Sequence, residues 1–287
     1  MDPMLKLDRR AVLAAAAAIL WALTPAAAGS TADGWVTAQN SRARLIWCGE
    51  GMRGPVDTRS QELGFIELQL EPGWKTYWRT PGDSGVAPAF DWADASNIAK
   101  TTAYYPAPHR IADQGGEAIG YHTSVIFPVH ILRRDPNSAT HAAVTASFGI
   151  CKNICIPVEV KLDGACYDQG MSPAIAMAVE VVPRAPGQAR DSDPKLMAVG
   201  GSVAGTSPRL TVDVDFGTKA TDTDLFIEAP EGLYVPLPRR AVPDAKGRAR
   251  FTVDLSNAID AKDLIGKELR LTMVSSKGAS EALWVAK

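Results

Sequence analysis

The sequence has no excess of charge of either sign and no long apolar run. Lys and Arg total 30 against 32 Asp and Glu, a formal net charge of -2 over 287 residues. A chain this balanced lacks the basic surface that attracts nucleic acids and anionic membranes. Its longest apolar run, residues 11–23, is shorter than the roughly 20 residues that a membrane-spanning helix needs. Nucleic-acid binding and stable membrane insertion are therefore not expected.

Signatures of several catalytic and cofactor sites are also missing. The 4 histidines are scattered, and Ser, His and Asp do not follow a hydrolase order. Neither a phosphate-binding loop nor a zinc-type repeat of cysteine pairs occurs. We therefore expect no cofactor and no dedicated metal site, and the chemistry of the chain must be sought in its cysteines.

The first 28 residues have the layout of a secretory signal peptide. Lys6, Arg9 and Arg10 precede the apolar run, and residues 25–28, Pro-Ala-Ala-Ala, provide a small-residue cleavage site. We predict that residues 1–28 are removed and that the mature protein is exported to the periplasm. All four cysteines then lie in a compartment where disulfides are permitted.

Beyond this segment the pattern is that of strands and turns. Apolar and polar residues alternate over two groups of segments, residues 66–70, 144–148 and 158–162, then 210–216, 251–255 and 269–273. Such alternation is typical of half-buried strands, and the 24 Gly and 20 Pro of the chain mark the turns between them. Helical signal is confined to residues 174–181 after Ser172 and residues 258–265 after Ser256. The predicted class is all-β, with two β-sandwiches.

A proline-rich polar stretch separates the two groups of strands. Residues 183–194 carry three prolines and have the composition of a linker. We place the boundary near residue 188, which gives an N-terminal domain over residues 29–187 and a C-terminal domain over residues 188–287. Both sizes suit a β-sandwich.

Cys151 and Cys155 lie between two predicted strands. On one straight strand their Cα atoms would be about 13 Å apart, far beyond the roughly 4.4 to 6.8 Å that a disulfide tolerates. We therefore predict a hairpin with residues 152–154 as its loop and one sulfur at each shoulder. Lys152 beside the first sulfur favours the thiolate form.

The size of the ring indicates what such a bond is for. In the chain-entropy model, a five-residue loop gives about 2 kcal/mol of stabilisation, whereas a Cys48–Cys166 bridge around about 119 residues gives about 5 kcal/mol. Cys48 and Cys166 are thus the better structural pair, and Cys151 and Cys155 suit thiol-disulfide exchange. An inert, stabilising Cys151–Cys155 disulfide is the alternative, which spacing alone does not exclude. Trp74, Tyr77 and Trp78 are assigned to the core, where aromatics around a strand usually pack.

Four motifs, taken in order, resemble one family. They are residues 73–85 (GWKTYWRTPGDSG), residues 105–110 (YPAPHR), Gly120-Tyr121 before residues 125–129, and residues 151–157 (CKNICIP). Together they resemble the periplasmic N-terminal domain of the DsbD and ScsB thiol-disulfide interchange proteins, over roughly residues 40–165.

The resemblance implies an immunoglobulin-like fold whose redox pair is Cys151 and Cys155. It implies a membrane-embedded thiol donor and periplasmic acceptors of the thioredoxin-like or disulfide isomerase-like kind. A second sandwich favours the ScsB-like form. In this family a cap loop shields the pair, and here it falls on the residues Asp113, Gln114, Gly115, Gly116 and Glu117. The sequence differs from DsbD there, because Gln114, Gly115 and Gly116 lie where the DsbD cap has aromatics.

Three functions therefore compete. The first is a thiol-disulfide oxidoreductase in which Cys155 attacks and Cys151 resolves the mixed disulfide. The second is a copper-tolerance protein that binds Cu(I) through Cys151 and Cys155, since two thiolates are soft ligands that suit this ion. The third is an interaction module in which both disulfides are inert.

Overall fold

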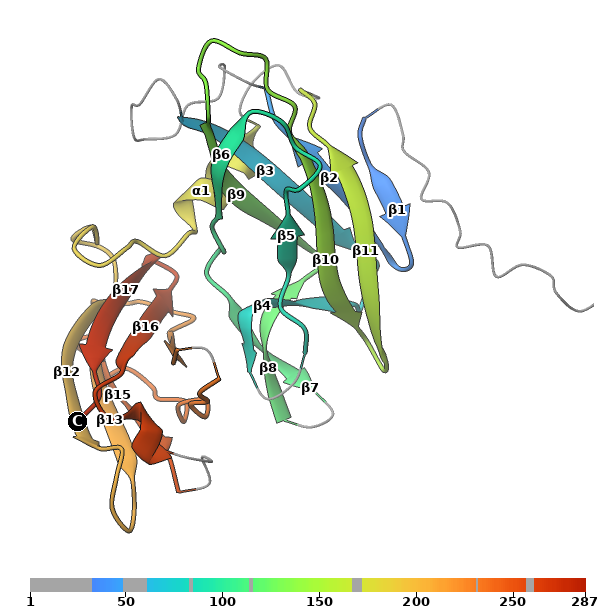
Figure 1. Cartoon of the computed structure of the whole chain (residues 1–287). Helices are drawn as coiled ribbons and strands as arrows, with labels where there is room; N and C mark the ends of the chain where they lie inside the picture. Colours follow the sequence, from blue (N-terminus) through green and yellow to red (C-terminus); the bar gives the residue numbers. More distant parts are fainter. Residues whose placement is uncertain are drawn as a thin grey trace, which may run out of the picture.

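The computed structural model describes residues 33–48, 61–82, 85–113, 116–166, 172–230, 232–256 and 261–287. The predicted signal peptide, residues 1–28, lies outside these ranges. Among the described residues the predicted all-β class is confirmed: strands account for nearly all the regular structure and every strand pair is antiparallel (Figure 1). No helix in this part of the chain is long and apolar enough to cross a membrane.

Two sheets form in the N-terminal half of the chain. The first has the strand order β1 (Val36–Ala38), β2 (Ser41–Ile46), β3 (Gln61–Leu70), β9 (Ser124–Arg133) and β6 (Ile98–Ala103). The second has the order β11 (Cys155–Asp163), β10 (Ala143–Cys151), β4 (Lys75–Gly82), β8 (Gly116–His122) and β7 (His109–Asp113), with β5 (Ala89–Asp91) also paired to β10. Their inner faces share one hydrophobic core, to which the predicted alternating positions of β3, β10 and β11 contribute.

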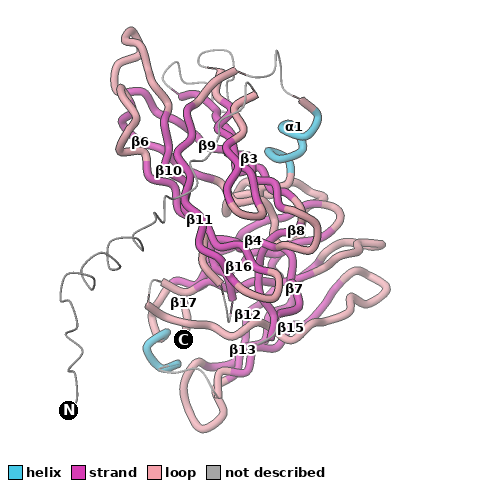
Figure 2. Tube along the Cα trace, turned by 90° about the vertical axis from the view of Figure 1, so that its right-hand side faces the viewer, coloured by secondary structure: helices cyan, strands magenta, loops and turns pink. Residues whose placement is uncertain are grey.

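Two smaller sheets form in the C-terminal third. One has the order β12 (Lys195–Ser202), β13 (Arg209–Asp215) and β15 (Arg248–Asp254), and the other β14 (Asp224–Glu228), β16 (Glu268–Ser275) and β17 (Gly278–Val285). A second hydrophobic core lies between them and contains the alternating apolar residues of β13, β15 and β16. The first core continues into this region, because Phe226, Val274 and Ala279 belong to it. Figure 2 shows β4, β8 and β16 where the two groups of sheets meet.

One α-helix connects the two groups. Helix α1 (Pro173–Glu180) begins after Ser172, whose hydroxyl accepts a hydrogen bond from the Ile175 amide, so this predicted helix and its cap are confirmed. Ile175 packs with Leu63 and Phe65 on the outer face of the first sheet. The second predicted helix is present only as a 3-10 turn, η2 (Ala261–Leu264), with residues 257–260 outside the described ranges.

The predicted linker is packed against the C-terminal sheets. The Arg184 amide donates to the Ala279 carbonyl (2.9 Å), and the Glu281 amide donates to the Arg184 carbonyl (2.8 Å). Farther along, the Asp193 side chain is fully buried and accepts from the Arg190 amide. The segment after α1 therefore lies against β17 and is hydrogen-bonded to it.

Candidate functional site

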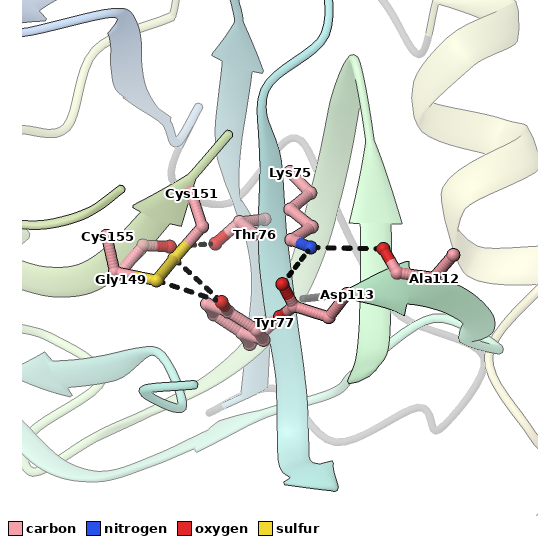
Figure 3. Close-up of a disulfide and its surroundings, with 8 residues drawn as sticks. All are labelled: Lys75, Thr76, Tyr77, Ala112, Asp113, Gly149, Cys151 and Cys155. Carbon is pink, nitrogen blue, oxygen red and sulfur yellow. Dashed lines mark hydrogen bonds and ion pairs between the residues drawn. A yellow bond between two sulfur atoms is a disulfide. The ribbon is translucent and has the colours of Figure 1, made fainter. Parts of the chain in front are cut away.

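The predicted cysteine hairpin is confirmed. Strands β10 and β11 pair in register so that Cys151 lies opposite Cys155, and residues 152–154 form the turn. The two sulfurs form a disulfide, with the Cα atoms 4.2 Å apart, and the Lys152 amide donates to the Ile154 carbonyl across the turn (3.1 Å). Figure 3 shows the disulfide beside β4. The hairpin thus holds two sulfurs close enough to bond without help from another segment.

The two cysteines differ in exposure. Cys151 is 2% exposed and packs with Tyr77 and Ala118, whereas Cys155 is exposed. Its neighbour Ile154, at the tip of the turn, is 65% exposed. At the predicted turn, Cys155 is therefore the one cysteine residue of the pair that is open to solvent, whereas Cys151 is buried.

Tyr77 supplies a polar group at the buried sulfur. Its hydroxyl donates to Cys151 Sγ at 2.7 Å and lies 3.5 Å from Cys155 Sγ (Figure 3). Burial, followed by the negative charge of Asp113, raises the pKa of Tyr77 above its ordinary value of 10.0. The hydroxyl therefore keeps its proton at neutral pH and remains a hydrogen-bond donor to sulfur.

Strand β4 fixes the position of Tyr77 through contacts on both of its neighbours. The Thr76 hydroxyl donates to the Gly149 carbonyl of β10 (2.8 Å), and β8 approaches so closely that a Cβ on Gly120 would collide with the Thr76 carbonyl. Gly85 covers the ring of Tyr77, has φ of +116°, and leaves no room for a Cβ. Only glycine tolerates that conformation and that close approach. The backbone at Gly85 therefore also packs against the ring of Tyr77.

An ion pair lies next to Tyr77. Lys75 Nζ is 3.0 Å from Asp113 Oδ1 and donates to the Ala112 carbonyl at 3.3 Å. The Lys75 and Asp113 side chains are only 7% and 13% exposed. Lys152, which the sequence placed as a thiolate-stabilising charge, instead donates to the Pro72 carbonyl (3.3 Å). The ammonium group buried near the site is therefore that of Lys75.

The cap-loop candidates that the structure describes contact two different parts of the chain. Asp113 ends β7 and faces Lys75 beside the site. Gly116 and Glu117 begin β8, and the Glu117 carboxylate pairs with Arg110 and Arg240. Gln114 and Gly115 lie outside the described residues. Of the candidates that the structure describes, only Asp113 contacts the surroundings of the disulfide.

Cys48 and Cys166 form the second disulfide. Their Cα atoms are 4.5 Å apart, and the bond joins positions 118 residues apart, so it closes the large loop considered from the sequence. Cys48 packs beside Ile46, Leu63 and Phe65 on the outer face of the first sheet. The described residues contain no free cysteine. They also contain no group of three or more His, Cys, Asp or Glu side chains arranged to hold a metal ion.

Sequence reasoning did not identify Tyr77 and Lys75 as site residues. It assigned Tyr77 to the core, where it is indeed fully buried, but its hydroxyl partner is a sulfur 74 positions away. One signal was available: a tyrosine in the middle of a buried strand requires a partner for its hydroxyl. For Lys75 the sequence offers no comparable signal.

Comparison with known proteins finds similarity over the part of the chain that contains Cys151 and Cys155. Residues 55–165 match the family model of the N-terminal part of the thiol:disulfide interchange protein DsbD. The chain is also similar to the crystal structure of the N-terminal periplasmic domain of ScsB from Proteus mirabilis, with a TM-score of 0.63 and 22% identity over 88% of this chain and 97% of that one. No curated protein matches the sequence. These matches confirm the predicted DsbD/ScsB-type domain and its immunoglobulin-like fold class.

Proposed function

We propose, from the premise that residues 55–165 are a DsbD/ScsB-type N-terminal domain, that this chain is an exported thiol-disulfide interchange protein. Its Cys151–Cys155 pair carries two electrons from a membrane-embedded dithiol donor to periplasmic thioredoxin-like or disulfide isomerase-like proteins. The supporting observation is the asymmetry of the disulfide, with exposed Cys155 and buried Cys151 hydrogen-bonded to Tyr77. A purely structural disulfide has no need of a polar group at one of its sulfurs.

Reduction of the disulfide begins at Cys155. A donor thiolate attacks Cys155 Sγ, the Cys151–Cys155 bond breaks, and the electron pair leaves on Cys151 Sγ as thiolate. Tyr77 already donates to that sulfur at 2.7 Å, so the hydrogen bond strengthens as negative charge develops. The second donor thiolate then attacks the donor's own sulfur and releases Cys155. The donor is oxidised to a disulfide and this chain becomes the dithiol.

Oxidation uses the same residues in reverse. The Cys155 thiolate attacks the acceptor disulfide, forms a mixed disulfide and releases one acceptor thiolate, which takes up a proton. Cys151, held on the adjacent strand with its Cα 4.2 Å from that of Cys155, then attacks Cys155 Sγ and releases the second acceptor thiolate. The acceptor is reduced by two electrons, and the Cys151–Cys155 bond forms again.

The role of Cys155 can be tested by trapping the mixed disulfide. The variant Cys151→Ala keeps Cys155 and lacks the resolving thiol, so it should form a lasting mixed disulfide, seen as a shifted band on a non-reducing gel, with a thioredoxin variant that keeps only one active-site cysteine, activated beforehand as a disulfide with a small aromatic thiol that leaves. Cys155→Ala is the matched control and should trap little, because Cys151 is buried. Equal trapping by both variants, or by neither, contradicts the proposal.

The reduction potential provides an independent test. Equilibrating the metal-free, full-length mature protein in glutathione buffers and trapping free thiols gives the potential of the Cys151–Cys155 pair. An electron carrier should lie in the range of about -180 to -270 mV that redox-active proteins share, whereas a structural disulfide lies below about -300 mV. A value below that limit rejects the exchange function in favour of an inert disulfide.

A further inference from the structure

A short segment after β4, residues Gly85–Pro88, crosses the Tyr77 ring next to the disulfide, and we call it the strap. Gly85 lies so close to the ring that a Cβ at this position would collide with it, and its φ is +116°. Its neighbour Val86 lies over Gly149 of β10, where an added Cβ would be 3.1 Å from the Val86 Cβ. The strap therefore packs against β4 and β10 at once.

The Tyr77 ring is held between two glycines from different segments. The ring atoms nearest to Gly85 are Cδ1, Cε1 and Cζ, whereas a Cβ on Gly149 would lie 3.5 Å from Cδ2 and Cε2, on the opposite edge. Ala118 and Cys151 pack with the same ring, which is fully buried. Contacts on both edges restrict the side-chain torsions of the tyrosine. The strap thus supplies one of the contacts that set where the hydroxyl points.

The far end of the strap is fixed to the strand that carries Cys151. The strap leads directly into β5, in which Ala89 pairs with Ser147 of β10. Pro88 is buried, and its carbonyl accepts a hydrogen bond from the Tyr105 hydroxyl (2.9 Å). Strand β10 therefore positions both the buried sulfur and one anchor of the segment that holds the hydrogen-bond donor of that sulfur.

The position of the Tyr77 hydroxyl matters most when the disulfide is reduced. Two electrons enter the pair, the S–S bond breaks, and Cys151 Sγ carries negative charge until it takes up a proton. The hydroxyl, 2.7 Å away, donates to a neutral sulfur before this step and to a charged one after it (Figure 3). Hydrogen bonds to charged groups are stronger than those to neutral groups. A donor fixed at this place therefore stabilises the reduced pair more than the oxidised pair.

We infer that Gly85 and Val86 are positioning residues that hold the Tyr77 hydroxyl at Cys151 Sγ and thereby favour the reduced, dithiol form of the pair. The inference deepens the proposed exchange function and rests on it for its place in the reaction. It gives a role to Gly85, the last residue of the motif over residues 73–85. Displacing the strap should make the Cys151–Cys155 disulfide harder to reduce.

The test is the equilibrium constant for reduction of the pair by glutathione. Two glutathione thiols become one glutathione disulfide, and the Cys151–Cys155 disulfide becomes two thiols. Full-length mature protein is equilibrated in glutathione buffers, and free thiols at Cys151 and Cys155 are alkylated and quantified by peptide mass. Gly85→Ala forces the Tyr77 ring to move and breaks the hydrogen bond. The constant should fall about tenfold, which makes the potential about 30 mV more negative for a two-electron couple.

Gly187→Ala is the matched control for this variant. Gly187 also has a positive φ, +81°, but no atom lies within 4 Å of a Cβ added there. Both substitutions place alanine at a positive φ and carry the backbone strain of that conformation. Only Gly85→Ala displaces the ring, so Gly187→Ala should keep the wild-type constant. A Gly85→Ala constant equal to that of the control overturns the inference.

A double-mutant cycle with Tyr77→Phe shows whether the strap acts through the hydroxyl. Tyr77→Phe keeps the ring and removes the donor, so it should lower the constant by about the same tenfold factor. Adding Gly85→Ala to Tyr77→Phe should change the constant no further, because no hydrogen bond remains to be lost. A second fall of the same size in the double variant would mean that Gly85 acts by another route, and it overturns the inference as well.

A milder variant covers the case in which Gly85→Ala does not fold. Val86→Gly loosens the strap without adding an atom, and Val242→Gly is its control, because Val242 is 93% exposed. Val86→Gly should lower the constant about threefold, since a freer strap leaves the hydrogen bond broken part of the time. A Val86→Gly constant equal to that of Val242→Gly overturns the inference.

The glutathione equilibrium also separates this inference from the proposed function, because it involves no partner protein. If the wild type fails to trap thioredoxin while the constants follow the pattern above, the positioning role stands and the carrier function fails. If trapping succeeds and Gly85→Ala matches its control, the carrier function stands and the positioning role fails.

Discussion

Lys75 and Cys151 are partners across β4 and β10, yet the Lys75 ammonium is held by Asp113 of β7 at 3.0 Å. The backbone pairing fixes the strand beside the disulfide, while the side-chain pairing fixes the end of β7. Lys75 therefore links β10, which carries Cys151, to the end of β7. The charges of Lys75 and Asp113 offset each other next to Tyr77. Removing the Lys75 charge and removing the Asp113 charge should therefore shift the pKa of Tyr77 in opposite directions.

The first prediction concerns this pair. Asp113→Asn removes a negative charge that raises the pKa of Tyr77, so that pKa should fall toward its ordinary value. Lys75→Met leaves Asp113 without its ammonium partner, and the pKa of Tyr77 should rise further. Each shift is measured by ultraviolet titration of tyrosinate, with the matching Tyr77→Phe double variant subtracted. Shifts of the same sign in both variants would show that movement of β7, rather than charge, dominates.

The second prediction concerns the hydrogen bond from Tyr77 to Cys151. Tyr77→Phe keeps the buried ring and removes the donor to the sulfur that leaves as thiolate. Since a hydrogen bond to a charged group contributes about 1.5 to 3 kcal/mol, glutathione should reduce the disulfide about tenfold more slowly. Tyr105→Phe is a matched control, because it removes a hydrogen bond to the Pro88 carbonyl (2.9 Å). A Tyr77→Phe rate equal to that of the control would exclude a role for the hydroxyl.

The local parts of the site could be predicted from the sequence, and the long-range parts could not. Two cysteines four positions apart between alternating runs require a hairpin, because a straight strand separates them too far. The aromatic residues of β4 indicate a buried strand, but they do not show which residue lies opposite Tyr77. Tyr77 meets Cys151 across 74 positions, and Arg110 meets Asp224 across 114. Such pairings depend on how the sheets pack.

The family resemblance identified residues 113–117, between β7 and β8, as one segment. It did not show that the two ends of this segment contact different parts of the chain. Residues 113–117 were predicted as one cap loop. In the structure Asp113 turns to Lys75, while Glu117 turns to Arg240. The strand boundaries explain this, since Asp113 ends β7 and Glu117 lies near the start of β8. The contribution of the C-terminal sheets to this segment has no signal in the sequence, because the charges involved are scattered among many exposed ones.

The third prediction separates the two disulfides by stability. Replacing Cys48 and Cys166 together by Ser should lower the free energy of unfolding by about 5 kcal/mol, since the bond joins positions 118 residues apart. Replacing Cys151 and Cys155 together by Ser should cost about 2 kcal/mol for a much smaller ring. Urea unfolding measures both. The first variant, assayed below its unfolding transition, should still exchange through Cys151 and Cys155. Loss of exchange in the folded variant would contradict the division of roles.

The fourth prediction is alkaline destabilisation through buried tyrosines. Burial raises the pKa of Tyr77, and it raises that of Tyr121, which donates to the Pro106 carbonyl (2.8 Å), well above 10.0. The folded state therefore keeps protons that the unfolded state loses once the pH exceeds about 10. The stability associated with these protons is fully present below that pH and is lost as the pH rises through the folded-state pKa values.

Urea midpoints measured from pH 8 to pH 11 should therefore fall steeply above about pH 10. Tyr121→Phe should be less stable than the wild type at pH 8, because it lacks the hydrogen bond to Pro106. It should nevertheless lose less stability between pH 8 and pH 11, since it has no Tyr121 proton to retain. The wild-type and variant curves should converge as the pH rises. Parallel curves would mean that Tyr121 does not contribute to the alkaline transition, and the loss would then belong to other groups.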